Sequence, residues 1–197
     1  MTPVRQRLAL VACILGSAIV FIDSTVVNVA LPALQRDLDA SLAEQQWVVE
    51  SYLLLLASLV LTGGALGDLF GRRRVFVLGV AGFGATSVLC ALAPNVELLV
   101  AARGLQGVAG ALLVPSSLAI LTEVYRDPVQ RGAAIGTWTA ATSAAIAVGP
   151  PVGGVLIDQL SWRAIFAMNV PIVAAALVIA LRHVPALEPA PGHSRRV

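Results

Sequence analysis

The chain has 197 residues, of which 58% are hydrophobic and 12% charged, and its mean hydropathy is +0.87. A soluble domain carries about twice that share of charge, roughly 25%, so the composition excludes an ordinary soluble protein. All 13 basic residues are arginines, and they are scattered along the edges of apolar runs. Without a basic patch, nothing indicates nucleic-acid binding.

Six apolar runs are long enough to cross a membrane. A helix needs about 20 residues to span a hydrocarbon core of roughly 30 Å, and these runs lack the alternation of barrel strands. We therefore predict an all-α polytopic membrane protein, with a helix bundle over residues 1–181 and a proline-rich cytoplasmic linker over residues 182–197. The predicted spans are residues 8–33, 47–67, 75–93, 98–121, 133–157 and 164–181.

The first span carries Asp23 and Asn28 in its second half. Arg5 and Arg7 before an apolar run would also fit a signal peptide, but these polar residues and five further spans favour an uncleaved helix. A carboxyl group that deep is costly unless it has a role or a partner, which makes Asp23 a candidate proton carrier. The alternative is a hydrogen-bonded structural aspartate.

Arginine sorting predicts the orientation. Six spans place both termini on one side, and ten arginines fall on that side against two, Arg36 and Arg163, on the other. By the positive-inside rule both termini are cytoplasmic, in a multi-pass protein of the plasma (inner) membrane.

The connection between the second and third spans, residues 64–74, combines glycines with charge. Gly71 permits a tight turn, and Asp68 can pair with Arg72 across it. The spacing of Gly64, Asp68, Gly71, Arg72 and Arg73 is more specific than topology alone requires. The alternative is a basic loop that serves only orientation.

The fourth span contains Arg103, followed by Gln106. A charge at that depth normally faces a bundle interior or a wet cavity and has a partner, and Asp23 is the candidate partner. A buried acid and base suggest a proton or substrate pathway; a static ion pair is the alternative. We expect Gln106 and Asn28 to face the same central cavity.

The fifth span contains the stretch Gly149, Pro150, Pro151, Val152, Gly153 and Gly154. We expect that this stretch cannot form a regular helix, that it bends the span, and that its glycines allow close packing on a neighbour. A kink without further function is the alternative.

Residues 64–74 resemble the signature loop of the major facilitator superfamily, although Leu69 stands where the family commonly has arginine. Further stretches resemble drug:proton antiporters of its fourteen-helix branch: residues 23–32, 103–107, 149–154 and 162–171. The resemblance implies the N-terminal six-helix bundle of that fold, built as a 3+3 inverted repeat. It also implies that Arg103 takes part in proton transfer, that the 64–74 loop gates the cytoplasmic side, and that the helix-five motif of Gly149, Pro150, Gly153 and Gly154 prevents leakage.

The function implied is proton-coupled efflux of lipophilic, often cationic drugs, with protons, membrane lipid and a second bundle of six to eight helices as partners. A second bundle is needed for alternating access, so we expect a truncated or half-length transporter. The alternatives are a non-transporting remnant or assembly partner, and a metabolite transporter of the same superfamily. We expect no enzyme activity, cofactor or metal site, because no catalytic or metal-ligand cluster occurs and both cysteines, Cys13 and Cys90, lie in apolar spans.

Overall fold

The computed structural model describes residues 2–185, and within them every regular element is an α-helix. The bounds are α1 Pro3–Leu38, α2 Leu42–Phe70, α3 Arg72–Ala91, α4 Val96–Val124, α5 Pro128–Gln159, α6 Ala164–Ala167 and α7 Asn169–His183. With α6 and α7 counted as one span, the described residues form six helices that are long and apolar enough to cross a membrane. The predicted fold class is therefore confirmed. Most of the predicted tail, residues 186–197, lies outside the described residues.

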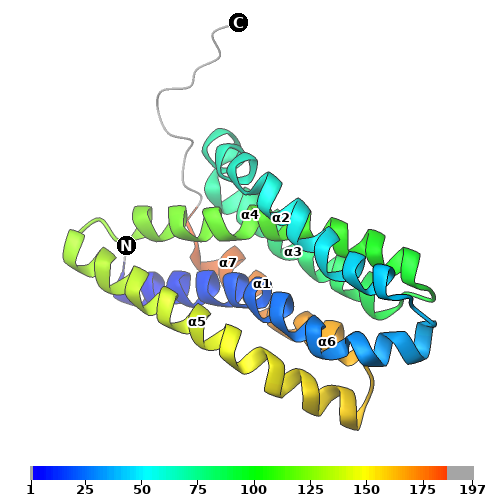
Figure 1. Cartoon of the computed structure of the whole chain (residues 1–197). Helices are drawn as coiled ribbons and strands as arrows, with labels where there is room; N and C mark the ends of the chain where they lie inside the picture. The colour runs from blue at the N-terminus through cyan, green and yellow to red at the C-terminus, as the bar shows by residue number, and fades with distance from the viewer. Residues whose placement is uncertain (1, 186–197) are drawn as a thin grey trace, which may run out of the picture.

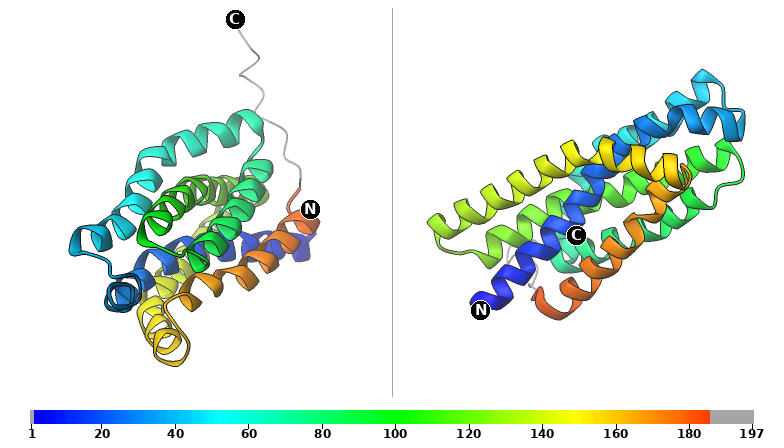
Figure 2. Two further views of the ribbon diagram at one scale, coloured as in Figure 1. Left: turned by 90° about the vertical axis from the view of Figure 1, so that its right-hand side faces the viewer. Right: turned by 90° about the horizontal axis from the view of Figure 1, so that it is seen from below.

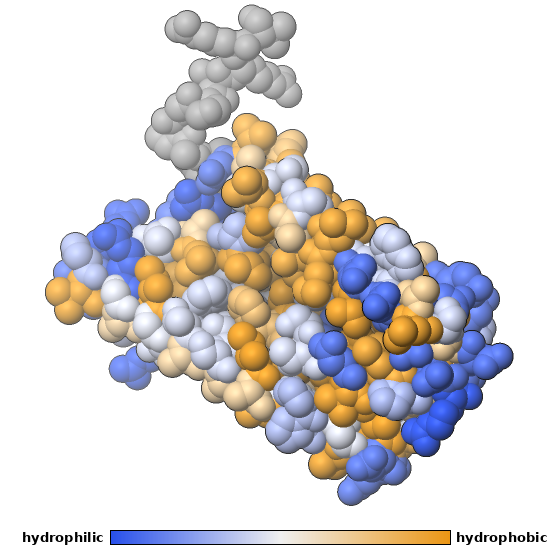
Figure 3. All heavy atoms as spheres, in the orientation of Figure 1, coloured by the Kyte–Doolittle hydropathy of each residue, from blue (hydrophilic) through white to orange (hydrophobic). Residues whose placement is uncertain are grey.

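The helices run side by side, and the start of α1 and the end of α7 lie at the same end of the bundle (Figures 1 and 2). On the face that Figure 3 shows, apolar residues dominate the middle, and hydrophilic residues gather mostly toward the two ends. That distribution matches an apolar slab between two aqueous phases.

Local sequence signals set the helix ends. Ser41 and Glu44 form a reciprocal capping box at the start of α2, and Asn95 accepts the Leu98 N–H at the start of α4. Asp127 accepts the Gln130 N–H at the start of α5. These caps satisfy backbone donors that helix starts leave without partners.

Helix α4 lies at the centre of the bundle and packs against α1, α2 and α3, while α1 packs against α5 and α7. Glycines bring α2 and α4 into backbone contact. A methyl group on Gly63 would collide with the Ala111 carbonyl, and one on Gly107 with the Tyr52 carbonyl. Pro115 leaves that Ala111 carbonyl without its intrahelical donor, so Gly63 lies against a carbonyl whose helical hydrogen bond is missing.

One expectation about helix five is wrong. Helix α5 continues through Pro150 and Pro151 without interruption. Pro150 cannot donate to the carbonyl of Ile146. The hydroxyl of Thr25 on α1 lies 3.4 Å from that carbonyl, but it lies closer, at 3.0 Å, to the Ile22 carbonyl of its own helix. The helix therefore stays continuous at the two prolines while it packs closely on α1.

The last predicted span, residues 164–181, is also less regular than expected. Its helix is divided at Met168, although that residue keeps helical dihedral angles of −62° and −22°. Pro171 lacks the N–H that would donate to the Ala167 carbonyl. One helical hydrogen bond is therefore missing, while the backbone at Met168 keeps its helical conformation.

Candidate functional site: a buried ion pair and its amide partners

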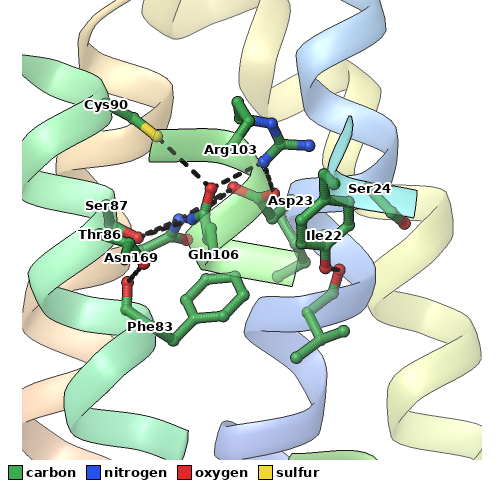
Figure 4. A network of polar contacts seen from close by, with 12 residues as sticks. Ile22, Asp23, Ser24, Phe83, Thr86, Ser87, Cys90, Arg103, Gln106 and Asn169 are labelled. Atoms are coloured by element: carbon green, nitrogen blue, oxygen red, sulfur yellow. Dashed lines mark hydrogen bonds and ion pairs between the residues drawn. The ribbon is translucent and has the colours of Figure 1, made fainter. Parts of the chain in front are cut away.

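Asp23 from the middle of α1 and Arg103 from α4 meet in the interior, where their side chains point toward each other (Figure 4). The Asp23 side chain is 0% exposed and that of Arg103 is 1% exposed. Arg103 Nη1 donates to Asp23 Oδ2. Two opposite charges that deep are tolerated because each supplies the partner the other needs.

The rest of the Arg103 guanidinium is held by neutral groups. Its Nε donates to the Val48 carbonyl at 3.1 Å, and its Nη1 also donates to Gln106 Oε1 at 2.8 Å. The guanidinium carbon lies 4.1 Å from the centroid of the Tyr52 ring, and the Tyr52 hydroxyl donates to the Val20 carbonyl at 2.9 Å. These contacts fix the orientation of the planar guanidinium group, which also stays positively charged.

The second oxygen of Asp23 accepts hydrogen bonds from two side-chain amides. Gln106 Nε2 lies 3.3 Å from Asp23 Oδ1, and Asn169 Nδ2 lies 3.2 Å from it. Both amides also donate to Ser87 Oγ, at 2.9 Å and 3.3 Å respectively. Helices α1, α3 and α7 thus contribute Asp23, Ser87 and Asn169, and α4 contributes Arg103 and Gln106, to a single buried cluster (Figure 4).

The turn between α2 and α3 is fastened to α4 by charge. Gly71 has a φ of 95°, which favours glycine. Arg72 Nη2 lies 3.0 Å from Asp68 Oδ1, and Arg72 Nη1 lies 3.7 Å from Glu123 Oε2 and donates to the Ala119 carbonyl at 3.2 Å. The pairing of Asp68 with Arg72 across the turn is present as the sequence suggested.

Two further residues of that loop motif contact other helices. Arg73 donates to the Leu181 carbonyl near the end of α7. Gly64 faces α4, where an added methyl group would lie 3.6 Å from Pro115. The motif therefore links α2 and α3 with both α4 and α7.

Two of the helix-five glycines pack on α1. A methyl group on Gly149 would collide with the Thr25 hydroxyl, and one on Gly153 would collide with the Val26 side chain. Gly154 has no atom within 4 Å of that position. The expected close packing is present at the first two glycines and absent at the third.

The N-terminal half of α2 bears a depression of about 370 Å³, lined by Trp47, Glu50, Leu53 and Leu54. Glu50 lies near the start of the predicted span 47–67. It was not among the predicted site residues, because it precedes the charge-free part of that run. One carboxylate among apolar and aromatic side chains is a suitable contact for an organic cation.

The sequence profile of the Major Facilitator Superfamily matches residues 13–197. The chain belongs to this superfamily. It is 45% identical over 188 residues to the methylenomycin A resistance protein of Bacillus subtilis, which covers 95% of the chain and 40% of that protein. It is 43% identical over 192 residues to the multidrug efflux pump LfrA of Mycolicibacterium smegmatis, covering 97% of the chain and 38% of the pump.

A third similar protein is the tetracenomycin C resistance and export protein of Streptomyces glaucescens, 45% identical over 172 residues. That match covers 87% of the chain and 32% of the other protein. The chain therefore spans between about a third and two fifths of the length of these three relatives. Its six helices correspond to the N-terminal bundle of the major facilitator fold.

Within that bundle, the structure brings together three of the four residues predicted for the central site: Asp23, Arg103 and Gln106. Asn28 lies outside the cluster. It is exposed, and its Nδ2 donates to the Ser24 and Thr25 carbonyls of its own helix.

Four residues around the central pair were not predicted from the sequence: Ser87, Asn169, Tyr52 and Cys90. The Cys90 thiol donates to Gln106 Oε1 at 3.6 Å. These side chains are uncharged, so their presence in apolar runs carries no strong penalty that would single them out. Asn169 does lie in residues 162–171, which resemble the antiporter branch, but that resemblance gives it no role.

Proposed function

We propose that this bundle is the proton-coupling half of a drug exporter, in which Asp23 takes up and releases the coupled proton. The observation that carries the proposal is the buried pair of Asp23 and Arg103 with its amide partners. An acid that loses its proton inside the membrane needs a fixed cation nearby, and Arg103 supplies one that stays charged.

The same pair offers two states of the bundle. With Asp23 ionised, the carboxylate attracts Arg103 and ties α1 to α4. With Asp23 neutral, that attraction is lost, while Arg103 keeps the Val48 carbonyl, Gln106 and the Tyr52 ring. Protonation of Asp23 therefore weakens one contact between helices and leaves others intact. In this way it can bias a conformational equilibrium of the bundle.

A second helix bundle is part of this proposal. In the most apolar 18-residue windows of α2 and α5, only 11% and 22% of the residues are buried, against 56% in α4. The relatives are longer than this chain, and in this proposal a segment like their additional residues covers the exposed faces of α2 and α5. In this arrangement both termini are cytoplasmic, the 64–74 loop contacts the second bundle from that side, and the glycines of α5 seal the path against leakage.

We propose lipophilic and often cationic compounds as substrates. The relatives include a multidrug efflux pump and a tetracenomycin C resistance and export protein. The depression on α2 adds a carboxylate, Glu50, beside the aromatic ring of Trp47, and the pair can attract an organic cation. Glu50 then contacts the substrate, while Asp23 handles the proton.

The test joins residues 1–197 to the C-terminal part of LfrA and measures proton-driven accumulation of a lipophilic cationic dye in inverted membrane vesicles. Asp23→Asn should abolish accumulation without preventing membrane insertion, because an amide keeps the shape but does not exchange a proton near neutral pH. Asp158→Asn, an exposed acid near the end of α5, is the matched control and should retain activity. Wild-type accumulation in Asp23→Asn would refute the proton-carrier role, and no accumulation with any variant would favour a non-transporting protein.

A further inference from the structure

One acceptor in the central cluster is left without a donor. Asn169 is 1% exposed, and both hydrogens of its Nδ2 are used, one toward Asp23 Oδ1 and one toward Ser87 Oγ. Its carbonyl oxygen, Oδ1, is buried and has no hydrogen-bond partner. A buried carbonyl without a donor is unfavourable, so its presence next to the proposed proton carrier calls for a physical reason.

The groups that bond Asp23 are all donors. Arg103 donates to Asp23 Oδ2, and Gln106 Nε2 and Asn169 Nδ2 both donate to Asp23 Oδ1. This arrangement suits a carboxylate, which only accepts hydrogen bonds. A neutral Asp23 would carry a new O–H donor, and that donor would face other donors unless one neighbouring group turned an oxygen toward it.

Asn169 is the amide that can turn at the lower cost. Gln106 Oε1 already accepts from Arg103 Nη1 and from the Cys90 thiol, so rotation of that amide would break both bonds. Rotation of the Asn169 amide breaks only its two contacts of 3.2 Å and 3.3 Å, both near the long end of the normal range. The Ser87 hydroxyl also has no acceptor among the described residues, so it has a hydrogen to offer.

We propose that the side-chain amide of Asn169 turns over when Asp23 takes up a proton. This proposal rests on the proposed role of Asp23 as proton carrier. The proton comes from water and bonds to Asp23 Oδ1, while Arg103 keeps its own protons. Asn169 Oδ1 then accepts from the Asp23 hydroxyl and from the Ser87 hydroxyl, so it gains two donors, while Nδ2 gives up its two acceptors, Asp23 Oδ1 and Ser87 Oγ. Asn169 is thus a positioning residue that gives each protonation state of Asp23 a hydrogen-bond partner.

The titratable and charged groups that face Asp23 come from three helices. They are Arg103 on α4, Tyr52 on α2 and Cys90 on α3. In the described part of the chain, α5, α6 and α7 bring no such group to it. A pH-dependent change at Asn169 between neutral and acidic pH therefore reports the protonation of Asp23.

The first test observes the amide itself in residues 1–197 reconstituted in lipid vesicles. The sequence has three asparagines, Asn28, Asn95 and Asn169, so labelling asparagine with ¹³C at the side-chain carbonyl gives few infrared bands. On acidification one labelled band should fall in frequency as the Asp23 acid band appears, because a free carbonyl gains donors. Asp23→Asn should remove both changes.

Two outcomes would contradict the inference in different ways. An Asp23 acid band without any change in the labelled bands would overturn the turning of Asn169 and leave the proton-carrier role intact. The absence of an Asp23 acid band at every pH at which the protein stays folded would overturn the proton-carrier role and this inference with it.

The second test uses Asn169→Leu and the same infrared titration. If Asn169 turns, this variant removes one hydrogen bond from each state of Asp23, because the carboxylate loses a donor and the neutral acid loses an acceptor. Half-protonation should then shift by less than about 0.3 unit. If Asn169 is only a donor to the carboxylate, half-protonation should rise by roughly 0.3 to 1 unit, a twofold to tenfold gain of proton affinity, and that result would refute the proposal.

Discussion

Removal of one charge from the buried pair should destabilise the bundle, and the remaining contacts indicate how much free energy of unfolding is lost. In Asp23→Asn the arginine keeps the Val48 carbonyl, Gln106 Oε1 and the Tyr52 ring, and loses its counter-charge. Breaking a buried pair typically costs about 3–5 kcal/mol. Because Arg103 retains three neutral partners, we expect the lower end, about 3 kcal/mol. Arg103→Gln should cost a similar amount, because it leaves a buried carboxylate.

The double variant tests whether the two charges act as a pair. Asp23→Asn with Arg103→Gln removes both charges, so it should be no less stable than either single variant, which gives a coupling energy of about 3 kcal/mol. The assay is unfolding of residues 1–197 in mixed micelles with increasing sodium dodecyl sulfate at neutral pH, followed by tryptophan fluorescence. Asp68→Asn with Arg72→Gln is the control, and this pair, whose side chains are 59% and 25% exposed, should couple by less than about 1 kcal/mol. Additive losses at Asp23 and Arg103 would refute the reasoning.

Three further outcomes are expected. Arg103→Lys keeps the charge but loses the planar group over Tyr52, so dye accumulation in the fused transporter should fall roughly tenfold; wild-type rates would show that charge alone suffices. Gly107→Ala should destabilise the bundle by about 1–3 kcal/mol, because the added methyl group collides with the Tyr52 carbonyl. The control Gly136→Ala, at a position with open space, should stabilise the bundle by up to about 1 kcal/mol. Equal effects of the two variants on unfolding in micelles would contradict this packing argument. Glu50→Gln should raise KM roughly twofold to fivefold for a cationic dye and leave an uncharged substrate unaffected; equal changes for both would remove Glu50 from cation recognition.

The sequence by itself determined that this is a six-helix membrane protein and which charged residues were exceptional within it. Both conclusions depend on local costs. A run of about 20 apolar residues spans the membrane wherever it occurs, and a charge inside such a run is costly whatever surrounds it. Asp23 and Arg103 could therefore be singled out, although they lie 80 residues apart.

Neutral polar residues gave no comparable signal. Asn28 and Asn169 are the same residue type in similar apolar runs, yet Asn28 bonds to its own helix at the surface and Asn169 bonds to Asp23 in the interior. An amide can be satisfied by local backbone or by a distant partner at similar cost, so the sequence does not distinguish the two. The packing of α7 against α1 and α3 makes the distinction.

The prolines of α5 show the same division between local and tertiary causes. From the sequence, Pro150 and Pro151 predict an irregular helix, because each removes a backbone donor and crowds the preceding turn. In the folded bundle α5 nevertheless stays helical, and Gly149 lets α1 approach so closely that the Thr25 hydroxyl lies 3.4 Å from the Ile146 carbonyl. Local sequence fixes which backbone groups lose their partners, and only the tertiary arrangement decides which side chains of a neighbouring helix lie beside them.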